Sequence, residues 1–140
     1  MMDQTDMLIL AELSRNSRIT MKQLGEKVHL TGQAAASRVA KLEDTGVIEE
    51  YSIKVNQVQL GYYIHAFITI YTNTPHTHNH QPLLTFIQEQ EQYVLNNYKI
   101  SGDGCYMLEC RFPSNEHADK FLEGLNKHAN YKLSIVIKKS

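Results

Sequence analysis

The hydrophobic pattern of this 140-residue chain changes its period near Gly46, and this change limits the fold more than any other feature. Before Gly46, apolar residues recur every three or four positions, which is typical of amphipathic helices. After it, short apolar segments are separated by turn residues, which is typical of strands. The sequence therefore predicts two parts: a helical part over residues 1–50 and an α+β part over residues 62–140, joined by an extended linker over residues 51–61.

Three helices separated by short breaks are predicted in the helical part. The second begins with Thr20 and Gln23, whose side chains can each accept a hydrogen bond from a free backbone N–H in a capping box. The third begins at a Thr31 cap and ends at Gly46, because glycine suits the left-handed position after a helix. These two helices with their short turn form a helix-turn-helix, although a plain three-helix bundle has the same spacing. The first helix, from Asp3 or Thr5 to about Ser14, is expected to bury Met7, Leu10, Ala11 and Ser14.

Charge is distributed unevenly, although the net charge of the whole chain is only −1. Between Arg15 and Lys41 there are six basic residues and one acidic residue, an excess of five positive charges. Acidic residues lie on both sides of this stretch. A local basic patch on a helix-turn-helix suits binding to phosphate, and a solvated helical face is the alternative interpretation. The six basic residues are Arg15, Arg18, Lys22, Lys27, Arg38 and Lys41.

The α+β part follows the order strand, helix, strand, strand, helix, strand. This is the order of the split β-α-β or ferredoxin-like fold, in which two helices cover one face of a four-stranded antiparallel sheet. The first strand is apolar on both sides, so the face without helices predicts a homodimer through the sheet. Strands are expected at residues 62–71, 93–101, 105–112 and 131–137, and helices at residues 82–92 and 114–128.

Several kinds of protein are disfavoured by the sequence. The longest apolar run, residues 7–11, is far shorter than the roughly 20 residues that cross a bilayer. Asp3 and Asp6 precede any apolar stretch, which argues against a secretory signal, so we expect a cytoplasmic protein without a membrane partner. Paired carboxylates, a Ser/His/Asp order and a phosphate loop are all missing from the pattern, which predicts that the chain is not an enzyme.

Cysteine and histidine provide the only signals for a metal site. Cys105 and Cys110 are too few for a disulfide framework and, by themselves, for a zinc site. His76, His78 and His80 alternate in a loop and could bind zinc or nickel if the loop folded back. Because no carboxylate or cysteine is close to them in sequence, we predict no metal and no other cofactor.

Motifs spread over nearly the whole chain resemble the Lrp/AsnC family, the leucine-responsive or feast/famine transcription regulators of bacteria and archaea. They are Asp3-x-x-Asp6 with Ile9-Leu10, Ser17-Arg18-Ile19-Thr20 before Leu24 and Val28, Arg38-Val39-x-Lys41-Leu42-Glu43-x-x-Gly46-Val47-Ile48-x-x-Tyr51, and Leu60-Gly61. The resemblance implies a winged-helix-like DNA-binding domain, then a split β-α-β (RAM) domain that forms dimers and often octamers. It also implies double-stranded DNA as partner and an amino-acid-like effector bound between dimers, near the turn joining the second and third strands. A nucleoid-like architectural DNA-binding protein without an effector is the alternative.

The third helix is the predicted recognition helix for the major groove. Gln33 can pair with adenine, and Arg38 with guanine or phosphate, although Arg38 could instead pair with an acid such as Glu43. Residues at the start of the second helix are expected to hold the DNA backbone. The complete set of predicted DNA contacts is Arg18, Thr20, Lys22, Thr31, Gln33, Ala34, Ser37, Arg38 and Lys41.

The chain departs from the family pattern at three places. His29 stands where the turn usually has glycine, and Gly32 stands where proline is frequent. In the effector turn, the family's Gly-x-x-Asp ends here in a cysteine, and a neutral thiol cannot replace a carboxylate opposite an ammonium group. This weakens the case for a leucine-like effector and strengthens the architectural alternative. If there is a pocket, its predicted residues are Tyr98, Gly102, Asp103, Cys105 and Tyr106.

Overall fold

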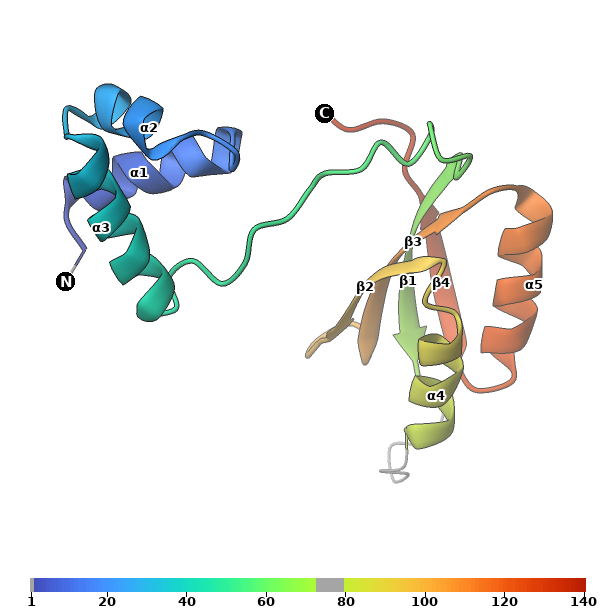
Figure 1. Ribbon diagram of the computed structural model, residues 1–140. Coiled ribbons are helices and arrows are strands. Elements are labelled where there is room, and N and C mark those ends of the chain that lie inside the picture. Colours follow the sequence, from blue (N-terminus) through green and yellow to red (C-terminus); the bar gives the residue numbers. More distant parts are fainter. Residues whose placement is uncertain (1, 73–79) are drawn as a thin grey trace. The chain divides into compact units, whose positions relative to one another are not determined.

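A computed structural model describes residues 2–72 and 80–140. The chain divides into two compact units, Met1–Lys54 and Val55–Ser140 (Figure 1). The first unit consists of helices, and the second combines a four-stranded sheet with helices. The predicted α+β class, with a helix-turn-helix followed by a split β-α-β domain, is confirmed.

The first unit contains α1 (Gln4–Arg15), α2 (Met21–Val28) and α3 (Gly32–Asp44). The side predicted to be buried was right for α2 and α3 and wrong for α1, where Ile9 and Leu13 are buried and Met7 is 54% exposed. Apolar residues occupy four successive positions from Met7 to Leu10, so the period alone could not choose the inner side. The core of the unit is Ile9, Leu13, Ile19, Leu24, Val28, Ala35, Val39 and Leu42.

The turn between α2 and α3 is compact because its backbone approaches α2 closely. His29 has a φ of 62°, a left-handed conformation that favours glycine, and Leu30 donates its N–H to the carbonyl of Gly25. A Cβ at Gly25 would lie 2.5 Å from the carbonyl oxygen of Leu30, so this position accepts only glycine without rearrangement. The capping box of Thr20 with Gln23 and the Thr31 cap are both confirmed.

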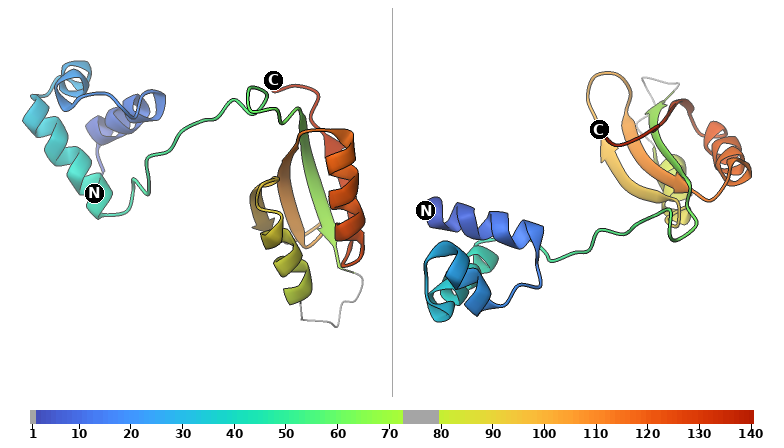
Figure 2. Two further views of the ribbon diagram at one scale, coloured as in Figure 1. Left: turned by 45° about the vertical axis from the view of Figure 1, so that its right-hand side comes forward. Right: turned by 90° about the horizontal axis from the view of Figure 1, so that it is seen from above.

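The second unit follows the predicted order of elements, with boundaries that differ by a few residues at most. The strands pair antiparallel in the order β2-β3-β1-β4, the topology of the ferredoxin-like fold. Figure 2 shows the strands side by side with α5 along them. The elements are β1 (Ile64–Tyr71), α4 (Gln81–Glu89), β2 (Val94–Lys99), β3 (Tyr106–Phe112), α5 (Asn115–Asn126) and β4 (Asn130–Ile135).

The two faces of this sheet differ in composition. Ala66, Ile68 and Ile70 on β1 are fully buried in one core with residues of β3, α4 and α5. The intervening Phe67 is 37% exposed, and it lies opposite Glu109 of β3. We call this second side the open face; it carries His65, Phe67, Thr69, Asn96, Tyr98, Met107, Glu109 and Arg111. It is more polar than the sequence of β1 alone predicted, because β3 contributes charged residues.

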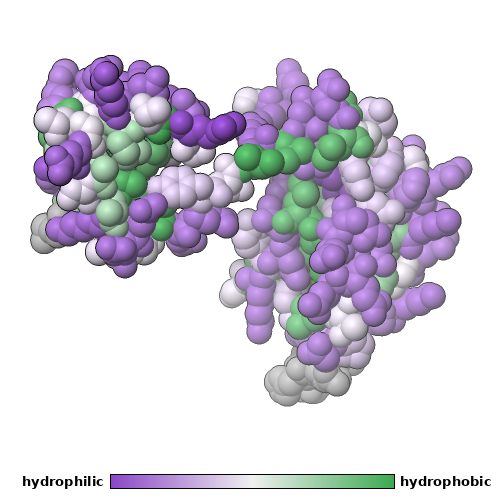
Figure 3. All heavy atoms as spheres, viewed as in Figure 1, coloured by the Kyte–Doolittle hydropathy of each residue, from purple (hydrophilic) through white to green (hydrophobic). Residues whose placement is uncertain are grey.

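Apolar side chains are also visible on the surface of both units (Figure 3). In the second unit they include Leu95, Tyr98 and Ile137, the last of which is 96% exposed. None of the helices in the part of the chain that is described is long and apolar enough to cross a bilayer. The predicted extended linker contains a turn at residues 57–61.

Candidate nucleic-acid interface

One side of α3 packs against the rest of the first unit, and the opposite side is exposed. We call this exposed side, which carries Gln33, Ser37 and Lys41, the bare side of α3. Ala35, Val39 and Leu42 face inward and are buried. Gln33, Ser37 and Lys41 are exposed, and the side chains of Ala34 and Ala36, which lie between Gln33 and Ser37 in the sequence, are small. An α-helix fits the width of the major groove of B-DNA, and a side free of bulky residues allows close approach to base edges. The bare side of α3 therefore has the size and polarity of a recognition surface.

The starts of α2 and α3 lie next to each other. A Cβ on Gly32 would be 3.2 Å from the Cα of Lys22, so glycine here permits close contact between the two helices. Thr20 and Thr31 accept hydrogen bonds from the backbone N–H of Gln23 and Ala34, which leaves their hydroxyl hydrogens free to donate. Two helix N-termini, each with free N–H groups and a favourable dipole, thus meet beside Lys22, and such a place suits a phosphate group.

Only half of the basic patch is neutralised by nearby acids. Glu12 of α1 pairs with Arg15 at 2.9 Å and with Lys27 at 4.0 Å, and Arg38 pairs with Asp3 and Asp6. Over residues 2–72 and 80–140, Arg18, Lys22 and Lys41 form no ion pair. These three exposed cations belong to the predicted DNA contacts. Counting charges along the sequence could not separate the two halves, because the pairing depends on how α1 packs.

Arg38 is turned toward α1. Its Nη1 donates to both carboxylate oxygens of Asp3, at 2.7 and 2.8 Å, and to Asp6 at 3.3 Å. The hydrogen bond from Arg38 holds the pKa of the Asp3 carboxyl below its usual value, and the same bond raises the pKa of Arg38. An acid does bind Arg38, as the alternative interpretation allowed, but Glu43 accepts from the hydroxyl of Tyr51 instead.

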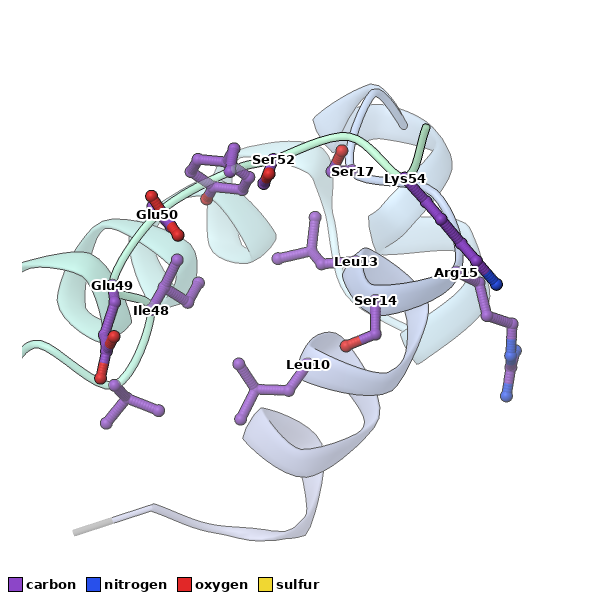
Figure 4. A pocket seen from close by; sticks show the side chains of 12 residues that line it. Leu10, Leu13, Ser14, Arg15, Ser17, Ile48, Glu49, Glu50, Ser52 and Lys54 are labelled. Atoms are coloured by element: carbon purple, nitrogen blue, oxygen red, sulfur yellow. The ribbon is translucent and has the colours of Figure 1, made fainter. Parts of the chain in front are cut away.

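A cavity of about 600 Å³ opens between α1 and the chain that follows α3 (Figure 4). Leu10, Leu13 and Ile48 form an apolar wall, and charged groups such as Glu49 and Lys54 lie at other points of its lining. None of the predicted DNA contacts lines it. No sequence pattern predicts this cavity, because it forms only where residues 47–54 return past α1.

The turn between β2 and β3 is tied to the end of β1. Asp103 accepts a hydrogen bond from the hydroxyl of Tyr71 at 3.0 Å, and the thiol of Cys105 lies 3.3 Å from the hydroxyl oxygen of Thr72. Gly102, Asp103 and Cys105 are therefore held together. The other predicted effector residues are not grouped with them: Tyr106 is 5% exposed and its hydroxyl bonds His80, and Tyr98 is on the open face.

The two cysteines have different chemical surroundings. Hydrogen bonds from the hydroxyl and backbone of Thr72 lower the pKa of the Cys105 thiol. Burial raises the pKa of Cys110 to about 12. Cys105 is thus the more readily ionised thiol, although a thiol with a lowered pKa still does not provide the carboxylate that the family pattern has at this position.

The three histidines of the predicted loop differ in whether the structure describes them. His76 and His78 lie outside the described residues. His80 precedes α4, and its Nδ1 lies 2.8 Å from the hydroxyl oxygen of Tyr106. Within residues 2–72 and 80–140, no group of three or more His, Cys, Asp or Glu side chains is arranged to hold a metal ion.

The helix-turn-helix with its cationic recognition side, followed by a split β-α-β domain, defines a two-part DNA-binding protein. A family of winged helix-turn-helix DNA-binding domains matches residues 2–49, and the Lrp/AsnC ligand binding domain matches residues 65–140. The chain therefore belongs to the Lrp/AsnC family of transcription regulators.

Individual relatives agree with this assignment. The HTH-type transcriptional regulator LrpA of Bacillus subtilis is 65% identical over 139 residues, which cover 99% of this chain and 100% of that protein. The structure of B. subtilis LrpC has a TM-score of 0.90 at 26% identity, covering 100% of this chain and 97% of that one. A feast or famine regulatory protein from M. tuberculosis, complexed with L-methionine, has a TM-score of 0.85 at 24% identity and covers 98% of this chain and 92% of that one.

Proposed function

We propose that the chain regulates transcription by inserting α3 into the major groove of double-stranded DNA. The bare side of α3 carries the proposal, because Lys41 lies on it and two adjacent helix N-termini meet beside Lys22. Within residues 2–72 and 80–140, neither lysine forms an ion pair. Gln33, Ser37 and Ala34 are the proposed contacts to base edges, with glutamine suited to adenine. The proposed phosphate contacts, which fix register rather than sequence, are Arg18, Thr20, Lys22, Thr31 and Lys41.

The open face of the sheet is the proposed dimer interface. Phe67 remains 37% exposed on this face. The carboxylate of Glu109 on the same face already has partners, because it lies 2.7 Å from His65 and accepts a hydrogen bond from Asn96 at 2.8 Å. Burial acts to raise the pKa of Glu109, but these hydrogen bonds outweigh it and hold the pKa below the usual value. A second copy can therefore cover Glu109 without leaving an isolated carboxylate. Arg111 on the same face differs, because its buried Nε has no hydrogen-bond partner among the described residues. The proposal includes larger assemblies, such as an octamer built from four of these dimers.

A two-fold dimer presents two recognition helices to the DNA. In such dimers the half-sites are about one helical turn, or a multiple of it, apart. The DNA target is therefore expected to be nearly palindromic.

An amino-acid-like effector at the β2–β3 turn is the second part of the proposed function. The methionine bound to the M. tuberculosis protein supports it, and Asp103 offers a carboxylate that a ligand ammonium group could bind. Cys105 favours the second candidate, an architectural DNA-binding protein without an effector, because the thiol occupies the place of the family's aspartate. These two candidates differ in sequence discrimination and not in the use of α3.

A binding titration separates them. The full chain is titrated on two labelled DNA fragments of equal length, the region upstream of its own gene and a shuffled sequence, each at two salt concentrations. A regulator is expected to prefer the first fragment by about 10³ or more and to lose affinity as salt rises. Equal affinity with a steep salt dependence would favour the architectural protein, after which a screen with methionine and other amino acids becomes unnecessary. Binding to neither fragment at low salt would reject the DNA-binding function.

A further inference from the structure

The N-terminal cap of α1 and the ion pair of Arg38 form one network. Asp3 accepts from the backbone N–H of Asp6 at 2.9 Å, and Asp6 accepts from the backbone N–H of Asp3 at 3.1 Å. Arg38 donates to both of these carboxylates from 32 or more residues away along the chain. The same two side chains therefore cap one helix and bind the recognition helix.

The network is partly shielded from water. The side chain of Asp6 is 14% exposed and that of Arg38 is 35% exposed, whereas Asp3, which accepts the two shortest bonds, is 54% exposed. A guanidinium that bonds both oxygens of one carboxylate and one oxygen of a second would have to give up these charge-assisted bonds before it could bind DNA. Lys41 lies less than one helical turn further along α3 and is exposed, and no ion pair involves it in the part of the chain that the structure describes.

We propose that Arg38 is a positioning residue: it fixes the recognition helix against the N-terminus of α1 and does not itself contact DNA. This inference rests on the proposed function, in which α3 enters the major groove. It removes Arg38 from the predicted base and phosphate contacts and gives Asp3 and Asp6 a role in sequence recognition. Because the two carboxylates outweigh the single positive charge of Arg38, they also limit attraction to DNA of any sequence.

The dependence of affinity on salt distinguishes a positioning residue from a phosphate contact. Each phosphate contact contributes about 0.9 to the slope of log K against log salt. Full-length R38M and K41M are compared with the natural chain on the upstream and shuffled fragments, because methionine keeps most of the aliphatic stem. We expect K41M to reduce the slope by about 0.9 per bound subunit on both fragments. We expect R38M to keep the slope and to lose about tenfold affinity for the preferred fragment only, as much as one mismatched base pair costs.

A second variant tests whether the carboxylate acts through Arg38. Asparagine caps helices as well as aspartate does, so D3N removes one of the two carboxylate charges that face Arg38, keeps that of Asp6, and keeps the cap of α1. We expect D3N to lose about the same affinity for the preferred fragment as R38M, and the double variant D3N/R38M to lose no more than either. Thermal unfolding of each variant confirms that the first unit is folded in these measurements.

The outcomes are distinct. A slope that falls in R38M as it does in K41M would overturn the inference and leave the proposed DNA binding intact, since Arg38 would then contact phosphate. Additive losses in D3N/R38M would also overturn it, because residues acting as one unit are not additive. A natural chain that binds neither fragment would reject the proposed function and the inference with it.

Discussion

Each unit has one exposed side that its own core does not cover: the bare side of α3 in the first unit and the open face of the sheet in the second. The two differ in their chemistry. On α3 the bare side contains small residues, and Lys41 on it and Lys22 beside its start have no acidic partner in the described part of the chain. On the sheet, the open face is broad and carries Phe67, Tyr98 and Met107, and its carboxylate Glu109 is bonded by His65 and Asn96. Unpaired charge suits a polyanion, whereas apolar area around a carboxylate that already has hydrogen-bond partners suits a protein surface.

Adjacent residues of β1 provide the strongest test of this contrast. Ile68 is fully buried beneath the helices, and Phe67 points to the open face. We expect Ile68→Ala to reduce the free energy of unfolding by about 2–5 kcal/mol, the usual cost of a large cavity. Phe67→Ala should leave the folded unit nearly as stable and weaken the dimer.

The measurement combines urea unfolding, followed by circular dichroism, with sedimentation at low and high protein concentration. Low concentration matters because a dimer adds its association energy to the apparent stability. If Phe67→Ala destabilised the monomer as much as Ile68→Ala, the open face would belong to the core of the unit and would not be free for a partner.

Gly25 tests whether the turn between α2 and α3 is as tight as its geometry indicates. A Cβ there would meet the backbone oxygen of Leu30, which cannot move away as a flexible side chain can. We expect Gly25→Ala to cost about 1–3 kcal/mol of unfolding free energy, in the range of overpacked cores. Gly46 is the control: its φ is 78° but nothing lies within 4 Å of an added Cβ, so Gly46→Ala should cost about 1 kcal/mol from backbone strain alone. Equal effects in thermal unfolding would argue against a close contact at Gly25.

The features that sequence could predict are those that depend on near neighbours. The capping box of Thr20 with Gln23 involves residues three apart, and the order of strands and helices follows from local periodicity. The bond between Arg38 and Asp3 joins residues 35 apart, and it depends on the angle at which α1 crosses α3. Sequence reasoning therefore predicted the helix-turn-helix correctly but did not predict which cation of its third helix is already bound.

The effector turn shows the same division. Both glycines of the turn have positive φ, as the hairpin pattern predicted. The bond from Tyr71 to Asp103 spans 32 residues and could not be seen in the sequence. Tyr106 was grouped with the turn because it is close in sequence, although strand alternation places its side chain in the buried core with the helices.

Gln33 tests the base-reading side of the contrast. A bidentate contact to adenine is worth about 1–3 kcal/mol of discrimination against a wrong base. We expect Gln33→Ala to lose this discrimination at one base pair of each half-site and to keep its affinity for shuffled DNA. Binding to a set of singly substituted sites measures the change. Lys22→Met is the matched control, since it should weaken binding to all of these sites alike, and a uniform loss in Gln33→Ala would show that Gln33 contacts the backbone.

The smallest expected effect concerns the two thiols. Cys110 lies on the side of the sheet that the helices cover, and Cys105 lies in the turn before β3. Cys110 is fully buried with the helices, and burial raises its pKa to about 12, whereas Thr72 lowers the pKa of Cys105. Since the thiolate is the reactive form, alkylation of the folded chain between pH 7 and 9 should modify Cys105 and spare Cys110. Mass spectrometry of the alkylated chain measures both sites, and Thr72→Val should slow only Cys105, by a few-fold, because its pKa then returns toward about 8.5.

The raised pKa of Cys110 also sets the direction in which alkali acts on the second unit. The folded state favours the protonated thiol, so this contribution to stability is complete below the ordinary thiol pKa of about 8.5 and is lost as pH rises toward 12. Cys110→Ala should flatten the fall in stability above pH 9, at the cost of a small cavity, and Cys105→Ala should not. Alkylation of Cys110 as fast as Cys105 at neutral pH would mean that the helices often leave the sheet and expose Cys110. The covered face would then differ much less from the open face than the packing indicates.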